Sequence, residues 1–567
     1  MRGPWVRSVV DRPEPAPHLT PTISRPSRLK SLRDGAIHIS PHPRVCWLLA
    51  VLLVALATPS STRAQSYDVI IRNGRVIDGT GNPWFFADVA LDGDRIAAIG
   101  DLATASGGRE IDATGLYVTP GFIDAHSHAG PGLATAGLSH GQPLLAQGLT
   151  TVVINPDGGG PVDLARQRNE LLRDGLGVNT AQLVPHGSIR VVVLGAGDRA
   201  PTVGDLEEMR ALVRRGMEEG AFGLSSGTFY APASYSDPEE IVELAEVVAT
   251  FGGAYTSHIR DESDYSVGLM AAVEEVIDVA RKAGIPGVVT HVKAMGPRVW
   301  GFGAAIIRRI EAAREEGIEV YTDQYPYTSS ATSLAAVLLP RWSQAGGTDS
   351  LMARFDRPGV LADIRSAMVD NLARRGGADR IQFRRVRFDE SIEGRLLSDV
   401  ARERGSDPID TAIDLLRRGG VSIISHNMDD DDVRTLMTPS WNMTASDGGL
   451  VPWMEGVPHP RSYGTFPRKI RQFVLEEGIV DLASAIRSMT GLPAQVLRIP
   501  DRGVLRTGAY ADVVVFDLAR INDPATFTEP HQLAEGMREV FVNGETALSS
   551  GEFTGTLAGR VIRRRQP

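Results

Sequence analysis

Two histidines one residue apart mark the first place where this chain could do chemistry. His126 and His128 stand in the segment G-F-I-D-A-H-S-H-A-G, after a short apolar run and before a glycine. Side chains at positions i and i+2 of a strand point to the same face, so both rings can approach one metal ion. An H-x-H pair alone is more often a structural or surface feature, and a metal site therefore requires further ligands elsewhere in the chain.

Metal-binding side chains recur where later β-like runs end. The run Y-T-S-H ends at His258, V-V-T-H ends at His291, and M-T-A-S-D-G contains Asp447. Zinc takes histidine nitrogens and carboxylate oxygens at ~2 Å, and catalytic sites leave one position open for water. Polar residues at so many strand ends are hard to explain as packing, so the pattern predicts a divalent metal centre.

Strand-like runs alternate with helical patterns through the centre of the chain, as they must to bring these residues together. The runs end at His126/His128, Asp157, His186, Gly227, His258, His291, Tyr325 and Asp447. Eight strands in this alternation predict an α/β fold, a (β/α)₈ TIM-like barrel with its active site at the carboxyl ends of the strands. The interval of about 334–410 lacks a strand of this series and is predicted to be an insertion over the barrel mouth.

A second metal ion needs a bridging ligand, and the composition narrows the choice. No lysine stands between Lys30 and Lys282, which excludes a carboxylated lysine near the middle of the barrel, and Cys46 is the sole cysteine. Asp157, in V-I-N-P-D-G-G-G, is the strongest remaining candidate. The alternative is that Asp157 only turns the loop before three glycines.

Short β-like runs at both ends predict a small β domain flanking the barrel. Asn73-Gly74 and Asp92-Gly93 each predict a hairpin, and A-D-V-V-V-F-D and V-F-V-N-G-E near the far end are again strand-like. We therefore expect four parts. These are a leader with signal peptide (1–64), the N-terminal part of a β-sandwich (65–117), the barrel (118–495) and the C-terminal part of the β-sandwich (496–567).

The leader has the features of a secretory signal. Arg44 precedes an apolar run from Val45 to Ala57, which is too short to span a bilayer, and a small-residue exit allows cleavage after Ala64. The protein is therefore predicted to be exported, to the periplasm or beyond, and not to be held in a membrane once the signal is removed. The alternative is a buried N-terminal helix.

Charge and cysteine content exclude several classes of function. The chain carries a net charge of −10 and residues 1–64 carry +6, so the remainder carries −16, which argues against nucleic acid as a partner. Because Cys46 lies in the signal, the exported chain would contain no disulfide and no thiolate ligand.

A set of motifs in one order gives the chain a family resemblance. They are G-F-I-D-A-H-S-H, Q-G-L-T-T-V-V, Y-T-S-H-I-R-D-E, T-H-V-K, D-Q-Y-P-Y, A-S-D-G, H-P-R-S-Y-G-T-F, M-T-G-L-P-A and A-D-V-V-V-F-D, which together span about residues 67–550. The chain resembles the amidohydrolase superfamily, and within it the N-acyl-D-amino-acid deacylases (D-aminoacylases). The resemblance implies a metal-dependent barrel with a β-sandwich built from both termini.

The resemblance also implies roles for individual residues. The metal ligands would be His126, His128, His258, His291 and Asp447, holding one or two Zn²⁺ ions or another divalent metal. One position departs from the family, because its usual N-C-G is P-D-G here and the family's cysteine ligand falls on Asp157.

Asp447 is expected to act first as general base toward water and then as general acid toward the leaving amine. An N-acyl amino acid also carries a carboxylate. By resemblance, the family's carboxylate clamp corresponds to Lys293, Tyr325 and Arg461, with Tyr327 as the alternative tyrosine. Lys293 is predicted to face the same side of its strand as His291. His186 and Arg260 also lie near strand ends. Either residue could support the ligands from behind or have no role in the site.

The function expected from these residues is metal-dependent hydrolysis of the amide bond of N-acyl amino acids. The D-series is implied by resemblance alone. Two alternatives stay open, a related cyclic-amide or dipeptide hydrolase and a catalytically inactive barrel that serves as a binding protein. The expected partner is a small-molecule substrate, and the sequence does not determine the oligomeric state.

Overall fold

The computed structural model describes residues 65–565 of the chain. The predicted leader and signal peptide lie outside the described residues, so export stays a prediction. Between residues 65 and 565, no helix combines the length and the apolar character needed to cross a membrane.

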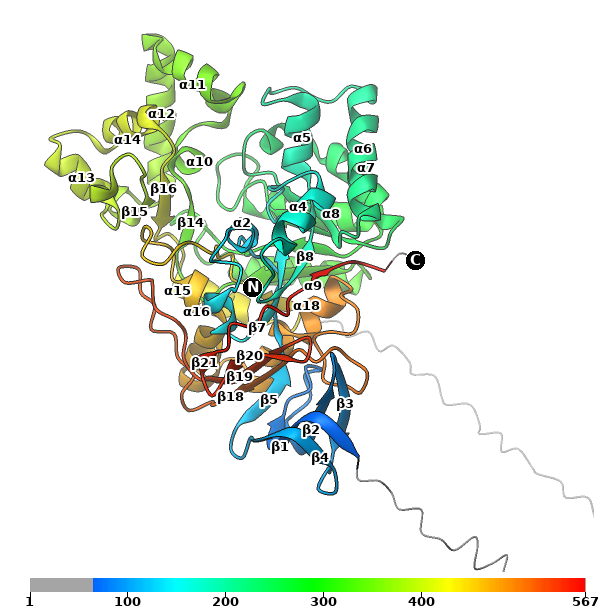
Figure 1. The fold of residues 1–567 in the computed structure, drawn as a ribbon. Helices are drawn as coiled ribbons and strands as arrows, with labels where there is room; N and C mark the ends of the chain where they lie inside the picture. Colours follow the sequence, from blue (N-terminus) through cyan, green and yellow to red (C-terminus); the bar gives the residue numbers. More distant parts are fainter. Residues whose placement is uncertain (1–64, 566–567) are drawn as a thin grey trace, which may run out of the picture. The chain divides into compact units, whose positions relative to one another are not determined.

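Parallel strands form the barrel that the alternation of strands and helices predicts (Figure 1). In chain order they are β6 (Phe122–Asp124), β7 (Leu149–Ile154), β8 (Asn179–Gln182) continued by β9 (Val184–Pro185), β10 (Gly223–Gly227), β11 (Ala254–His258), β12 (Gly287–Val289), β13 (Val320–Gln324) and β17 (Asn442–Thr444). Each pairs in parallel with the next, apart from the step between β8 and β9, where one strand bends into the other. All of their carboxyl ends therefore open on one face.

The barrel closes between its first and last strands, at the segment that carries the histidine pair. The His128 amide donates to Gly448 O at 2.9 Å, and the Asp447 amide donates to His126 O at 2.9 Å. Asp124 reinforces this seam, because its carboxylate accepts from the Ser446 amide at 2.8 Å and from Ser446 Oγ at 2.5 Å. The hydrogen bonds that close the barrel therefore also bring His126, His128 and Asp447 together.

Amphipathic helices cover the outside of the strands. They include α4 (Leu164–Leu172), α5 (His186–Leu194), α6 (Val203–Glu218), α7 (Pro238–Ala249), α8 (Leu269–Ala283), α9 (Gly303–Glu315), α15 (Asp430–Met437), α16 (Arg461–Arg468) and α17 (Leu482–Met489). Polar N-caps begin several of them, and Thr202 with Asp205 forms a capping box on α6. Apolar faces of α6, α7 and α8 pack on the strands in one large buried cluster.

Strands from both ends of the chain share one hydrogen-bonded sheet, as the sequence predicts. Its order is β21-β20-β19-β18-β5-β1-β2-β3, with β4 paired to β1. The strands are β1 (Ser66–Val76), β2 (Phe85–Asp92), β3 (Arg95–Gly100), β4 (Ser106–Asp112), β5 (Tyr117–Pro120), β18 (Val513–Phe516), β19 (Met537–Val542), β20 (Glu545–Ser549) and β21 (Glu552–Phe553). The last short strand, β22 (Val561–Ile562), instead pairs with β8 of the barrel.

One of the two predicted hairpins is wrong. The Asp92-Gly93 hairpin forms, with Gly93 and Asp94 as the turn between β2 and β3, but Asn73 and Gly74 lie inside the continuous strand β1. The register of β1 against β2 shifts between Ile71 and Gly74, and Asn73 has φ 59°. An Asn-Gly pair supplies a left-handed residue, which suits a β-bulge as well as a two-residue turn.

Residues 330–425, which follow β13 and precede β17 along the chain, form a separate layer. Its elements are labelled β14–β16 and α10–α14 in Figure 1. Its antiparallel sheet has the order β14 (Ser330–Ser333), β16 (Ser422–Ser425), β15 (Ile381–Arg385). Its helices are α10 (Leu334–Leu338), α11 (Gly347–Phe355), α12 (Pro358–Arg374), α13 (Leu397–Glu403) and α14 (Pro408–Arg418). This layer packs a hydrophobic core of its own, and the Gly346 amide donates to Ala196 O at 2.8 Å beyond α5.

A buried lysine lies between the barrel and its helices, and no carboxylate of residues 65–565 pairs with it. Lys469, first residue of the π-helix η5 (Lys469–Glu476), donates to Thr444 Oγ1 and Ser488 Oγ, each at 2.9 Å. Burial lowers the pKa of Lys469 to about 7. Thr444 and Ser488 also hydrogen-bond to each other at 2.9 Å, so they keep a partner if the ammonium is removed.

Replacing Lys469 by Met is expected to raise the free energy of unfolding at pH 7 and below. Above pH ~7 the folded lysine has lost a proton that the unfolded chain still binds, so wild-type stability rises with pH from ~7 to ~10. One pKa unit corresponds to ~1.4 kcal/mol, which gives an upper bound of roughly 5 kcal/mol. Urea unfolding of wild type and variant from pH 6 to pH 10 measures the difference. The exposed Lys282→Met serves as control, and an unchanged pH dependence in Lys469→Met would contradict the prediction.

Candidate metal centre

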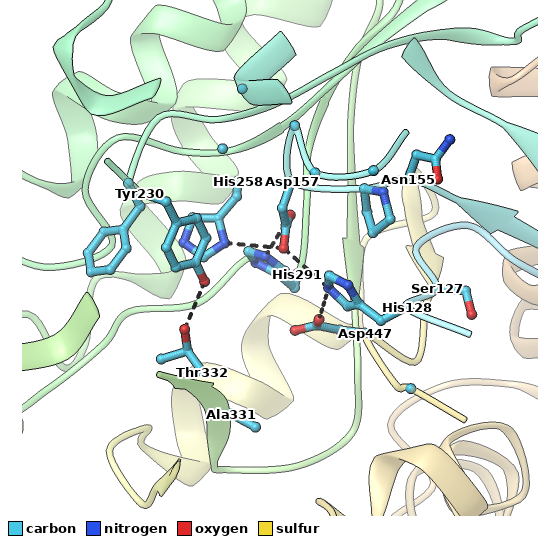
Figure 2. Close-up of a pocket in the computed structure, with 18 of the residues that line it drawn as sticks. Ser127, His128, Asn155, Asp157, Tyr230, His258, His291, Ala331, Thr332 and Asp447 are labelled. Atoms are coloured by element: carbon cyan, nitrogen blue, oxygen red, sulfur yellow. Dashed lines mark hydrogen bonds and ion pairs between the residues drawn. The ribbon is translucent and has the colours of Figure 1, made fainter. Parts of the chain in front are cut away.

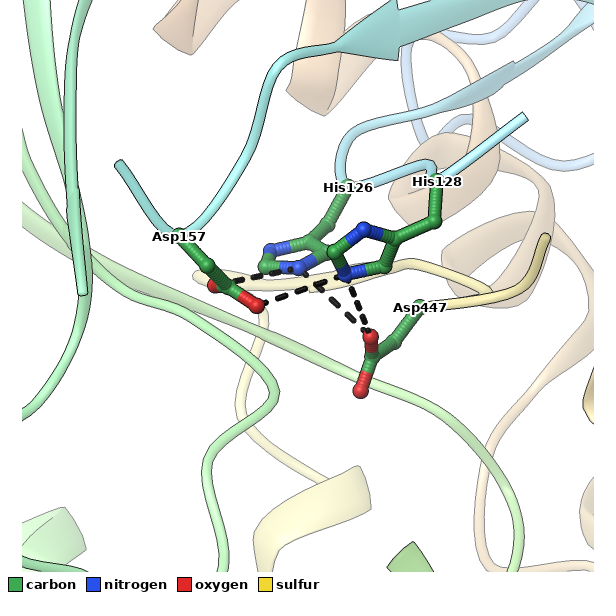
Figure 3. A group of neighbouring side chains, drawn as sticks. All are labelled: His126, His128, Asp157 and Asp447. Atoms are coloured by element: carbon green, nitrogen blue, oxygen red, sulfur yellow. Dashed lines mark ion pairs between the residues drawn. The ribbon is translucent and has the colours of Figure 1, made fainter. Parts of the chain in front are cut away.

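Six potential ligands meet at the carboxyl ends of five barrel strands. His126 and His128 follow β6, Asp157 follows β7, His258 ends β11, His291 follows β12 and Asp447 follows β17. Figure 3 shows Asp157 and Asp447 facing the two rings of the H-x-H pair, and Figure 2 shows His258 and His291 on the other side of Asp157. The structure thus brings together every metal ligand that the sequence suggests.

The Asp157 carboxylate lies between two pairs of imidazoles. Its Oδ1 lies 3.3 Å from His126 Nε2 and 3.5 Å from His291 Nε2. Its Oδ2 lies 3.3 Å from His128 Nε2 and 3.8 Å from His258 Nδ1. Two overlapping groups can hold an ion, and both contain Asp157. They are His126, His128, Asp157 and Asp447, and Asp157, His258 and His291.

Asp447 completes the first group from the opposite side. Its Oδ1 lies 3.1 Å from His128 Nε2 and 3.7 Å from His126 Nε2. Ligand atoms placed tetrahedrally at ~2.1 Å from one zinc ion lie ~3.4 Å apart, which is close to these separations. Several of the buried atoms have no hydrogen-bond partner in the part of the chain that is described, namely His126 Nε2, Asp157 Oδ1 and both ring nitrogens of His258. Unsatisfied buried donors and acceptors of this kind fit a divalent cation.

Three of the six candidate ligands have an unusual backbone. Asp157, His291 and Asp447 are in the left-handed region, with φ of 55°, 36° and 47°. A left-handed non-glycine residue costs on the order of 1 kcal/mol, and such residues cluster at functional sites. Gly227 allows the loop of Asp157 to approach, because a Cβ there would lie 2.2 Å from Asp157 O.

The protonation states of these groups favour cation binding. Burial lowers the pKa of His128, but Asp157 and Asp447 raise it to about 9. Burial raises the pKa of Asp157, but His126 and the other imidazoles hold it well below its usual range. The two carboxylates therefore favour positive charge on their neighbours, and a protonated imidazole such as His128 supplies it when no metal cation is bound. A divalent ion displaces those protons, so its affinity falls in acid.

Glu262 supports the second group of ligands and was missed at the level of sequence. Its Oε1 lies 3.2 Å from His291 Nδ1, and its Oε2 lies 3.7 Å from His258 Nε2. A carboxylate that accepts the outer ring N–H of a ligating histidine fixes its tautomer and orientation. The only signal is position, since Glu262 follows His258 by four residues in Y-T-S-H-I-R-D-E.

Lys293 lies at the site, but not on a strand as the sequence predicts. The strand β12 ends at Val289, so Lys293 is not on a strand with His291. Its ammonium nonetheless lies 2.8 Å from His291 Nδ1 and forms a buried ion pair with Glu262. The substrate-binding lysine that the sequence suggests is thus already paired.

Arg461 and Tyr325 lie together beside Asp447. Arg461 Nη1 lies 2.8 Å from Asp447 Oδ2, and its guanidinium lies 4.6 Å from the centre of the Tyr325 ring. The Tyr325 hydroxyl is buried without a hydrogen-bond partner among the described residues, whereas the Tyr327 hydroxyl donates to Asp523 at 2.7 Å. These contacts favour Tyr325 over Tyr327 as the residue with a free hydroxyl.

Two other residues near strand ends lie apart from the metal ligands. His186 begins α5 and its Nε2 lies 2.8 Å from Glu240, and Arg260 forms an ion pair with Glu275 at 2.8 Å. Both side chains are occupied by these partners.

A cavity of about 1080 Å³ opens over the ligands. His128, Asp157, His258, His291 and Asp447 line its floor, together with Lys293 and Arg461. Its opposite wall includes residues of the 330–425 layer, namely Ser330, Ala331, Thr332, Arg375, Arg384 and Ser422. Figure 2 shows Tyr230 between His258 and Thr332, and its hydroxyl lies 3.2 Å from Thr332 Oγ1.

Comparison with known proteins agrees with this geometry. Residues 109–547 match the Amidohydrolase family. The chain is 34% identical to a D-aminoacylase of Alcaligenes xylosoxydans xylosoxydans, over 89% of this chain and 99% of that protein. It is 33% identical to an N-acyl-D-glutamate deacylase of the same organism, over 88% and 97%. An N-acyl-D-glutamate deacylase of Bordetella bronchiseptica, solved with zinc and a phosphonate inhibitor, matches with a TM-score of 0.74 and 32% identity, over 88% and 100%.

Replacing Asp157 by Asn is expected to lower the number of metal ions bound per chain. Asparagine tolerates the left-handed backbone and keeps the shape of the side chain, but it removes the charge shared by the two groups. Metal analysis after dialysis against zinc measures the change, with the exposed Asp174→Asn as control. Equal metal content in Asp157→Asn and wild type would contradict the assignment of Asp157 as a shared ligand.

Replacing Glu262 by Gln is expected to weaken metal binding ~10–100-fold, as loss of such an outer partner commonly does. Competition with a chelator gives the dissociation constant. Circular dichroism shows whether the variant, which leaves Lys293 without its carboxylate, still folds. A folded variant with unchanged affinity for the metal would show that Glu262 only pairs with Lys293 and does not support the metal ligands.

Proposed function

The chain belongs to the amidohydrolase family, and from this premise we propose that it hydrolyses the amide bond of N-acyl-D-amino acids. The products are a carboxylic acid and a free amino acid. The D-series is supported by the similarity to a D-aminoacylase and an N-acyl-D-glutamate deacylase over nearly their whole lengths. Zinc is the metal we propose, because histidine and carboxylate ligands suit it and the related Bordetella enzyme was solved with it.

One observation carries the proposal, namely the position of Asp447 between the metal ligands and a cation. One oxygen of its carboxylate lies 3.1 Å from His128 Nε2, and the other lies 2.8 Å from Arg461. The same residue can therefore exchange protons at the reacting centre while Arg461 stands ready for the substrate carboxylate.

The two ligand groups that share Asp157 would hold the divalent metal, which would polarise the amide carbonyl and lower the pKa of a water molecule toward ~7. Burial raises the pKa of Asp447, but Arg461 and His291 hold it well below its usual range, so the carboxylate is ionised and can accept a proton. Asp447 takes one proton as the water oxygen forms its bond to the carbonyl carbon. It then delivers that proton to the amide nitrogen as the C–N bond breaks, which makes the amine a leaving group.

Lys293, Tyr325 and Arg461 provide recognition of the α-carboxylate in this proposal. Lys293 Nζ lies 5.8 Å from the centre of the Tyr325 ring, and the Arg461 guanidinium lies 4.6 Å from the same point. The unpartnered Tyr325 hydroxyl can donate a hydrogen bond to the carboxylate. Binding the substrate by its carboxylate places the neighbouring amide next to Asp447, because only the α-carbon separates the two groups.

A cyclic-amide hydrolase remains the second candidate, since it would use the same ligands without a carboxylate clamp. Purified protein loaded with zinc should release free amino acid from N-acetyl-D-amino acids, and more slowly or not at all from the L-isomers, dipeptides and hydantoins. Hydrolysis of hydantoins alone would sink the deacylase proposal. Bound metal with no turnover of any substrate would favour a binding protein.

Replacing Asp447 by Asn is expected to lower kcat ~10²–10⁴-fold, the usual contribution of general acid–base catalysis. Asparagine tolerates the left-handed backbone at this position, so the fold should persist. Steady-state kinetics on N-acetyl-D-amino acids, with metal content measured on the same preparation, separates lost proton transfer from lost metal. A variant that binds metal normally and keeps its full kcat would rule out the proposed role.

A further inference from the structure

One arginine that lines the cavity has neither an ion-pair nor a hydrogen-bond partner for its guanidinium among the described residues. Of the Lys and Arg side chains on the cavity wall, Lys293 is paired with Glu262, Arg461 lies 2.8 Å from Asp447, and Arg375 Nε donates to the Tyr265 hydroxyl at 2.7 Å. The fourth is Arg384. Its guanidinium has no hydrogen-bond or ion-pair partner within residues 65–565, and the charges of Arg461 and Asp447 act on it through space.

The backbone is shaped to point this side chain into the cavity. Arg384 lies in β15, where the pairing with β16 is regular up to Phe383 and resumes at Arg385, so Arg384 is the extra residue of a β-bulge. Bulges beside active sites re-aim a side chain that regular alternation would turn elsewhere. The Arg384 carbonyl accepts from the Val457 amide at 2.9 Å, which ties the bulge to the loop between Asp447 and Arg461.

Arg385, the next residue along the chain, is by contrast surrounded by carboxylates. Arg385 Nη1 lies 2.8 Å from Glu390 and 3.0 Å from Glu393, and its Nη2 lies 3.0 Å from Glu455. Three carboxylates thus surround one arginine and none contacts its neighbour. Carboxylates are thus present close to Arg384 along the chain, and its lack of such a partner is specific to the side chain that lines the cavity.

An unpaired charge in this position is unfavourable without a ligand. Burial and the charge of Arg461 lower the pKa of Arg384 to about 10, which still leaves it protonated at neutral pH. A partly buried guanidinium gains most from an anion that can accept two parallel hydrogen bonds, as a carboxylate does. The site for such an anion is open toward the cavity, since Arg384 lines it.

We propose that Arg384 binds a second anionic group of the substrate, the side-chain carboxylate of an N-acylated acidic amino acid. This inference rests on the proposed function, which assigns the α-carboxylate to Lys293, Tyr325 and Arg461. Arg384 approaches from the 330–425 layer rather than from the barrel, so it meets a part of the substrate farther from the scissile amide. The cavity of about 1080 Å³ has room for that extension. Arg384 is a specificity-determining residue in this proposal and takes no part in the bond-breaking step.

The test compares two substrates of nearly equal size, N-acetyl-D-glutamate and N-acetyl-D-glutamine. A charge-assisted hydrogen bond contributes ~1.5–3 kcal/mol, so wild type should prefer the glutamate by ~10–100-fold in kcat/KM. Arg384→Met should remove this preference by lowering kcat/KM for the glutamate, while the glutamine substrate changes less than about twofold. Arg387→Met, an exposed arginine three residues along the same segment, should leave both values unchanged.

The possible results separate this inference from the proposed function. Wild type that cleaves both substrates equally well, or an Arg384→Met variant that loses both equally, overturns the role of Arg384 and leaves the deacylase activity standing. If neither substrate is cleaved, calorimetric titration with the products D-glutamate and D-glutamine still decides the inference. Tighter binding of D-glutamate that disappears in Arg384→Met supports it, and equal or absent binding overturns it.

Discussion

The contact between one carboxylate and four imidazoles is the constraint on which the rest of the structure depends. Asp157 reaches His126 and His128 on one side and His258 and His291 on the other, within 3.3–3.8 Å. A carboxylate has two oxygens, so it can face two ligand groups at once, as a bridging thiolate would with one sulfur. The described part of the chain contains no cysteine, and Asp157 fills the shared position with a ligand that cannot be oxidised.

Holding these groups together requires backbone that most residues avoid. Three ligands have a left-handed conformation, and buried carboxylates keep two of their segments in place. Asp323 accepts from the His291 amide at 2.6 Å, and Asp124 accepts from the Ser446 amide next to Asp447. The strain persists because strand pairing and these hydrogen bonds over-determine the chain at each point. Packing of the barrel thus stabilises a geometry that the isolated loops would not adopt.

Sequence reasoning found the ligands because each breaks a local pattern. A histidine or aspartate directly after a buried strand is out of place in a core, and barrel topology places such positions on one rim. Glu262 and Arg384 carry no such signal. Glu262 acts largely through His291 and Lys293, about 30 residues farther along the chain, and the bulge that exposes Arg384 depends on the pairing of β15 with β16. The Asn73–Gly74 hairpin failed for a related reason, because a left-handed residue is compatible with a turn and with a bulge, and only the pairing of β1 with β2 decides between them.

Charge pairing links the two halves of the cavity floor. Glu262 faces both His291 and Lys293, and Asp447 faces both His128 and Arg461, so each carboxylate serves the metal ligands and a cation of the substrate clamp. A substrate carboxylate that binds Arg461 competes with Asp447 for the same guanidinium. Because Arg461 is the strongest of the charges that lower the pKa of Asp447, sharing it makes Asp447 a stronger base. Under the proposed function, the base would therefore gain strength when the substrate is in place, and proton transfer would be tied to correct recognition of the α-carboxylate.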